Sequence, residues 1–110
     1  MASEKIFTNN TPHDLQVKLR VRRGEDPRET AENLDFPLRA QQSQWIRYGN
    51  EIDIYLNGIH AEASLADGSV IELNELVTQR GSRLDDQLNT NDAIDFTFDS
   101  GQLKLSARRA

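Results

Sequence analysis

The stretch IDFTFDSGQLKLSAR, residues 94–108, indicates a β-hairpin. Apolar and polar residues alternate along both of its halves, and Asp99-Ser100-Gly101 separates the two. The apolar set is Ile94, Phe96, Phe98, Leu103, Leu105 and Ala107. Alternation at a period of two is typical of a strand with one buried face, and a short Gly-containing turn joins antiparallel neighbours. The stretch therefore predicts antiparallel β-structure at this end of the chain.

The same period of two continues through most of the sequence. LQVKLRVR, residues 15–22, places four aliphatic side chains on one face and four polar ones on the other. LDFPLRA, residues 34–40, repeats the pattern, and Pro37 indicates an edge strand or a bulge because proline lacks the N–H of a ladder. Three further strands are expected in EKIFTN (4–9), GIHAEASL (58–65) and VIELNEL (70–76), with a turn at 66–69.

Two segments depart from this pattern. Ser82 followed by Asp85 predicts the start of a helix, so we expect one short helical turn near 82–90. The polar segment 23–33 is the longest loop candidate, although its second half also suits a helical turn.

The pattern as a whole predicts an all-β fold with seven or eight short strands, separated by turns about every 8–12 residues. No βαβ spacing is present, so we expect antiparallel sheets only. The outline is similar to immunoglobulin-like sandwiches in general, which implies a two-sheet antiparallel β-sandwich with Greek-key connections. A small closed barrel is the alternative. We expect residues 1–110 to form a single β-sandwich domain.

Composition narrows the functional classes. The chain has no cysteine, which excludes disulfides, thiolate metal sites and cysteine nucleophiles. Its net charge of −5 disfavours nucleic acid and anionic membranes as partners. No long apolar run predicts an export signal or membrane insertion, and this favours a cytoplasmic location. With no GxSxG turn and no phosphate-binding glycine motif, we expect no enzymatic activity.

Charge is divided unevenly along the chain. Residues 1–50 carry eight basic and seven acidic side chains, about +1, and residues 51–110 carry five and eleven, −6. A basic stripe on the outward face of strand 15–22 is the most regular charged feature. Its members are Lys18, Arg20, Arg22 and Arg23. The stripe could contact an acidic partner or the acidic half of a second copy, or form an ordinary solvated strand face.

Metal and cofactor sites find little support in the sequence. The two histidines, His13 and His60, are too far apart to match a zinc motif, so we expect surface histidines, no metal and no cofactor. A calcium site would require the acidic groups at Asp67, 85–86 and Asp92 to meet at one end of the fold.

WIRYGNEIDIYLNGIH, residues 45–60, contains the only tryptophan and both tyrosines. If Gly49-Asn50 is a two-residue hairpin loop, Trp45 faces the core, and Ile46 and Tyr48 face outward. A loop of odd length reverses the faces, because a shift of one residue turns each side chain to the opposite side. We expect Trp45 in the core, where immunoglobulin-like sandwiches place their tryptophan.

Either register leaves aromatic residues on the surface, since Tyr55 faces outward in both. Aromatic side chains beside Arg and Asp are typical of interface hot spots. The candidate contact residues are Trp45, Ile46, Arg47, Tyr48, Asp53 and Tyr55. We expect a non-enzymatic module that acts through protein–protein contact, with a homodimer among the possible assemblies. The alternative is a carbohydrate- or calcium-dependent ligand-binding module, in which the aromatic faces stack on sugar rings.

Overall fold

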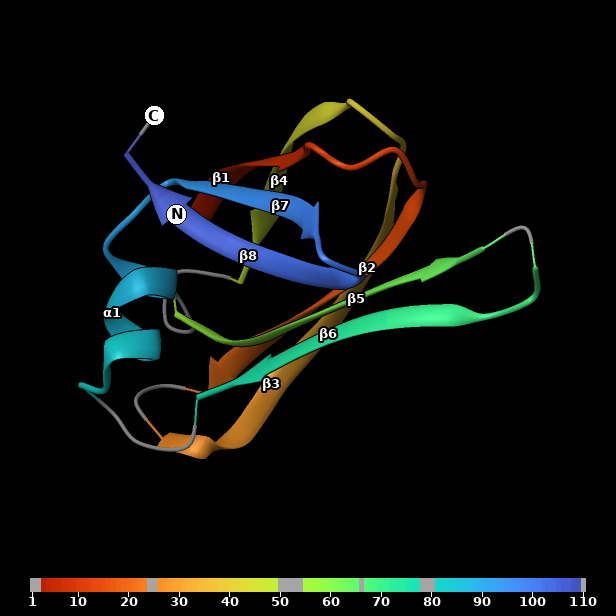
Figure 1. The fold of residues 1–110 in the computed structure, drawn as a ribbon. Coiled ribbons are helices and arrows are strands. Elements are labelled where there is room, and N and C mark those ends of the chain that lie inside the picture. Colours follow the sequence, from red (N-terminus) through yellow and green to blue (C-terminus); the bar gives the residue numbers. More distant parts are fainter. Residues whose placement is uncertain (1–2, 24–25, 50–54, 66, 78–80, 110) are drawn as a thin grey trace.

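A computed structural model of the protein describes residues 3–23, 26–49, 55–65, 67–77 and 81–109, without the side chains of Ser3, Arg23 and 26–31. Eight strands and one helix lie in these segments (Figure 1). In chain order they are β1 (Ser3–Asn9), β2 (Leu15–Arg23), β3 (Asp26–Leu38), β4 (Ser43–Tyr48), β5 (Leu56–Ser64), β6 (Val70–Leu76), α1 (Arg83–Asn89), β7 (Ala93–Asp99) and β8 (Gln102–Arg108).

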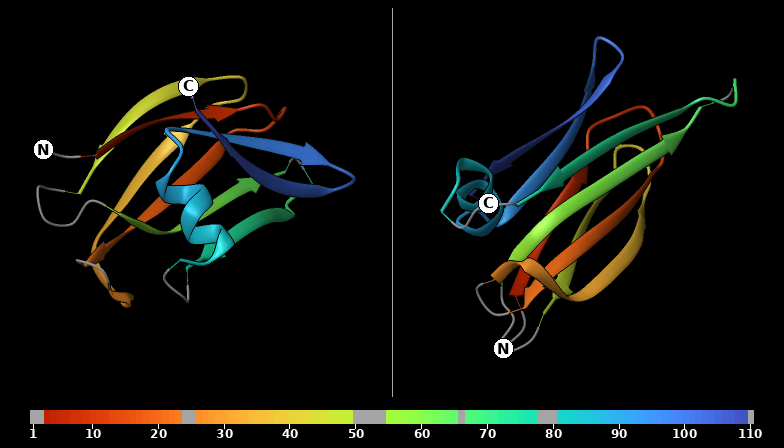
Figure 2. Two further views of the ribbon diagram at one scale, coloured as in Figure 1. Left: turned by 90° about the vertical axis from the view of Figure 1, so that its left-hand side faces the viewer. Right: turned by 90° about the horizontal axis from the view of Figure 1, so that it is seen from below.

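The strands form two four-stranded sheets packed face to face, which confirms the predicted all-β sandwich. The first sheet has the order β4-β1-β7-β8 and the second the order β3-β2-β5-β6. Figures 1 and 2 show the two layers, with α1 at one end. The alternating apolar residues of both sheets meet between them. The largest buried apolar side chains are Phe7, Phe96, Leu19, Leu38, Leu56, Ile59, Leu88, Ile94, Val17 and Val21.

Two local predictions are confirmed in detail. β7 and β8 pair as an antiparallel hairpin, and Ser100 and Gly101 at its tip both have positive φ, 52° and 76°. This is the backbone that a two-residue hairpin loop with a right-handed twist requires. α1 begins after Ser82, whose Oγ accepts a hydrogen bond from the Asp85 N–H at 3.2 Å. No helix in the described segments has the length and apolar character to cross a membrane.

One pair of strands is parallel, contrary to the expectation of antiparallel pairing only. β1 and β7 run in the same direction, with Phe7 opposite Ile94. The two strands are distant in the sequence, so no local βαβ signal marks their pairing. The immunoglobulin-like Greek key is not confirmed: the first two strands of an immunoglobulin domain are neighbours in one sheet, whereas β1 and β2 lie in different sheets.

The interpretation of 23–33 as a loop is wrong. β3 begins at Asp26 and pairs with β2 as the outer strand of the second sheet. An edge strand makes hydrogen bonds on one side only, and polar residues there discourage pairing with other chains. This explains a strand without apolar alternation in its first half. The edge position that Pro37 indicated is confirmed.

The predicted hairpin between β4 and β5 is also wrong. β4 pairs with β1 in the first sheet, and β5 pairs with β2 and β6 in the second. β5 begins at Leu56, and residues 50–54, with the candidate Asp53, lie outside the described residues.

The expectation of a buried Trp45 is wrong as well. The Trp45 side chain is 53% exposed, whereas Tyr48 is only 3% exposed and Ile46 packs against the core. The reason is the register with β1, which places Trp45 opposite the outward Ile6 and Ile46 opposite the inward Lys5. This register buries Tyr48, partly buries Ile46 and leaves the indole of Trp45 in water.

Candidate functional site

The exposed indole of Trp45 lies on the outer face of the first sheet, within an ordered set of side chains. Beside it, Arg47 Nε donates a hydrogen bond to Glu4 Oε2 at 3.0 Å. On its other side, the hydroxyls of Thr8 and Ser43 are 2.8 Å apart and hydrogen-bonded. We call these residues, together with Ile6, the Trp45 surface. Its members are Glu4, Ile6, Thr8, Ser43, Trp45 and Arg47.

Within the described segments, the outer edge of β4 offers backbone pairing positions that no other strand occupies. β4 is the end strand of its sheet, and the Asn9 N–H donates to the Gln42 carbonyl at 2.9 Å in the register of the β1–β4 ladder. Hydrogen-bonded pairs recur at every second residue of an antiparallel ladder. The backbone groups turned toward β1 therefore belong to Gln44, Ile46 and Tyr48. The groups turned toward the open edge belong to Ser43, Trp45 and Arg47.

β4 is also the least protected of the four edge strands. Natural sheets protect their edges with charged side chains and proline. β8 carries Lys104, β3 carries Pro37, and β6 carries Glu72 and Glu75. β4 has no proline, and its single charged residue, Arg47, is paired with a neighbour in its own sheet. An extended segment of another chain would therefore meet the fewest obstacles at β4.

Tyr55 does not belong to the Trp45 surface. It lies just before β5, at the end of the second sheet, with the Arg22 guanidinium carbon 5.6 Å from its ring centroid. Arg22 is only 2% exposed, so its predicted place in an outward basic stripe is wrong. β2 changes register with both neighbours near Val21 and Arg22, and such an irregularity turns consecutive side chains to the same side.

The buried Arg22 is held by a polar cluster that joins α1 to the second sheet. Its Nη2 donates to Asp85 Oδ1 at 2.5 Å, and its Nε to Asn57 Oδ1 at 3.4 Å. Asp85 also accepts hydrogen bonds from the Gly81 N–H and from Asn89 Nδ2, both at 2.8 Å. A hollow of about 490 Å³ opens beside the cluster. Because the ionic groups bind each other, we assign the cluster a structural role.

The charge of Asp85 makes stability depend on pH. Burial raises the pKa of Asp85, but the hydrogen bonds from Gly81, Arg22 and Asn89 outweigh burial and hold the pKa below its usual value. A depressed pKa in the folded state stabilises the fold above the unfolded-state value, about 4, and this stabilisation is lost as the pH falls through the folded-state pKa. We expect the stability difference between wild type and Asp85→Asn to shrink below about pH 4. Urea unfolding at a series of pH values measures it, and a constant difference would contradict this assignment.

The acidic groups proposed for calcium do not come together. Asp67 lies in the turn between β5 and β6, at the opposite end of the fold from α1, which carries Asp85 (Figure 1). Asp67 accepts hydrogen bonds from the Ser69 hydroxyl and N–H, which lower its pKa. These contacts are typical of a turn, and the calcium-dependent alternative loses its geometric basis.

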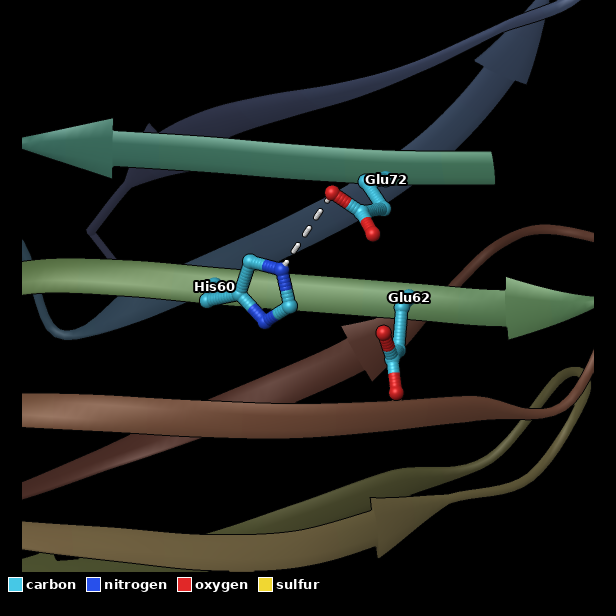
Figure 3. Close-up of side chains that lie close together, drawn as sticks. All are labelled: His60, Glu62 and Glu72. Atoms are coloured by element: carbon cyan, nitrogen blue, oxygen red, sulfur yellow. Dashed lines mark ion pairs between the residues drawn. The ribbon is translucent and has the colours of Figure 1, made fainter. Parts of the chain in front are cut away.

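A cluster of three ionisable side chains lies on the outer face of the second sheet. His60 and Glu62 of β5 and Glu72 of β6 bring one potential metal-ligand atom each within 4.8 Å of the others (Figure 3). The expectation that His60 is an isolated surface histidine does not account for this arrangement. A signal was present, because the turn at 66–69 already sets Glu62 opposite Glu72. His13, in contrast, packs edge-on against Phe98, with ring centroids 5.3 Å apart.

No family model matches the chain, and comparisons with curated proteins and with solved structures also find no match.

Proposed function

We propose that this protein is an interaction module that pairs through the edge of β4, and that its partner is a second copy of the same chain. One observation carries the proposal: the most exposed large apolar side chain, Trp45, lies on the least protected edge strand of the described structure. Addition of a strand to an open edge is a common mode of recognition, in which backbone hydrogen bonds supply affinity and side chains supply specificity.

The phase of the ladder selects one register for this pairing. Only Ser43, Trp45 and Arg47 turn their backbone groups outward, so an antiparallel pair makes the most hydrogen bonds when Trp45 lies opposite Trp45 of the second copy. Ser43 then lies opposite Arg47, and no like charges meet. Directly opposed aromatic residues on one face of a sheet favour pairing by about 0.2–1 kcal/mol.

A single substitution tests the backbone part of this proposal. Arg47→Pro removes an N–H on the open edge and leaves the hydrogen bonds to β1 intact. A twofold pair loses two hydrogen bonds, worth about 0.5–1.5 kcal/mol each, so we expect dimerisation to weaken about ten- to hundredfold. Sedimentation equilibrium over a dilution series measures it. Arg47→Ala is the matched control, because it removes the same side chain and keeps the N–H, and it should dimerise nearly as wild type does.

The side-chain part has its own matched pair of variants. Trp45→Lys should abolish association, whereas Val70→Lys changes a residue of similar exposure, 52%, on an edge strand of the other sheet and should not. In the wild type, Trp45 emission should shift to longer wavelength on dilution. A mass that stays dimeric in Trp45→Lys would show that the contact lies elsewhere. A wild type that is monomeric at every concentration, with a Trp45-dependent signal on a glycan array, would instead support carbohydrate binding.

A further inference from the structure

We infer that His60, Glu62 and Glu72 form a site for a divalent transition-metal ion such as Zn²⁺. The site lies on the outer face of the second sheet, away from the Trp45 surface, and it does not depend on the proposed dimer. His60 and Glu62 are separated by one residue on β5 and so project from the same face, and Glu72 lies directly opposite Glu62 on β6. Figure 3 shows the three side chains side by side above the two strands.

The distances require only small side-chain movements to bind an ion. The potential ligand atoms lie within 4.8 Å of one another. Tetrahedral ligands about 2.1 Å from zinc are themselves about 3.4 Å apart, so rotation of exposed side chains is sufficient to close the site. His60 Nε2 is already 3.8 Å from Glu72 Oε2. The β5–β6 ladder fixes the backbone positions beneath all three residues.

Electrostatics also favour a cation at this position. Two carboxylates directly opposite each other on neighbouring strands repel and destabilise the pair. Glu62 and Glu72 are such a pair, and the imidazole of His60 relieves their repulsion only when it is protonated. A bound dication would neutralise both carboxylates. Lys18 of β2 lies opposite His60 of β5. Its positive charge repels a bound cation and so lowers the affinity of the site for cations.

The donor set selects the class of metal. One imidazole nitrogen and two carboxylate oxygens suit zinc and its neighbours in the first transition series. Calcium prefers six to eight oxygen ligands, more than this site offers. With three protein ligands, a tetrahedral ion keeps one position open for water or for a ligand from a partner.

Titration calorimetry of the full untagged chain with zinc chloride tests the site. We expect a 1:1 complex. His60→Gln and Glu72→Gln should each weaken it at least tenfold, since changes outside the ligand set alone commonly cost about 10- to 100-fold. His13→Gln, the control that changes the other histidine, should leave the affinity unchanged. Lys18→Gln should tighten binding about threefold, because it removes a nearby positive charge.

Each result of the titrations either supports or overturns the proposed metal site. No measurable binding to wild type would overturn the site. Equal losses in His60→Gln and His13→Gln, or none in either, would identify an adventitious ion only. Tighter binding by Lys18→Gln, together with loss in His60→Gln, would support the assignment, because the two effects together place the ion beside both residues. His60, Glu72 and Lys18 lie on the outer face of the second sheet, and far-UV circular dichroism confirms that each variant, His13→Gln included, is folded.

Discussion

Replacement of Asp85 by alanine is expected to lower the free energy of unfolding by about 3–5 kcal/mol, which is the usual cost of leaving a buried ionic partner without its counter-charge. Arg22 would remain almost fully buried with its main acceptor gone. The Gly81 N–H and Asn89 would lose an acceptor as well. Urea unfolding followed by far-UV circular dichroism measures the effect. Tryptophan emission is a poorer probe because Trp45 is already exposed in the folded chain.

The neighbouring residue provides the control. Asp86→Ala removes an exposed carboxylate from the same turn of α1 and should change stability by less than about 0.5 kcal/mol. The double variant Arg22→Met/Asp85→Leu should recover much of the loss, since apolar residues of similar volume can replace a buried ion pair. Equal effects of Asp85→Ala and Asp86→Ala would contradict the role assigned to the cluster.

Phe7→Ala is expected to destabilise the fold by about 3–5 kcal/mol, the typical cost of deleting a buried phenyl ring. Phe7 of β1 is fully buried and packs on Phe36 of β3, with ring centroids 5.4 Å apart and ring planes inclined by 59°. The pair links the first sheet to the second, so the cavity left by alanine opens between the layers. Thermal unfolding by circular dichroism measures the loss.

Two further variants keep this prediction testable if Phe7→Ala does not fold. Phe7→Leu retains most of the apolar volume and should cost about 1–2 kcal/mol. Ile6→Ala changes the adjacent, outward residue of the same strand and should cost less than Phe7→Leu. A larger effect at Ile6 than at Phe7 would show that the faces of β1 are assigned incorrectly.

The alternation of apolar and polar residues correctly predicted which side chains of a strand face the core, but it did not predict which strands pair with one another. The apolar positions of 15–22 and 94–108 are buried or partly buried as predicted, and Ser82 caps α1. The departures are two polar residues of these strands, Arg22 and Asp95, which are buried as well. The same pattern predicts a β4–β5 hairpin, although these strands lie in different sheets. That hairpin requires a short loop between the two strands, and nothing in the local sequence indicates that β4 pairs with β1 instead. For this reason the candidate contact residues do not share one surface. Trp45 and Arg47 lie on the outer face of the first sheet, whereas Tyr55 lies against Arg22 at the end of the second sheet.

The sequence by itself determined the class of fold, most of the strands, the tight hairpin at Ser100-Gly101 and the position of the helix, because period-two alternation, turn residues and caps act between near neighbours in the chain. Only the tertiary structure decided that β1 lies parallel to β7, that an irregularity in β2 buries Arg22 beside Asp85, and that Trp45 faces water. These features depend on which distant strand supplies the hydrogen bonds and in which register. A shift of one residue reverses every face without changing the pattern.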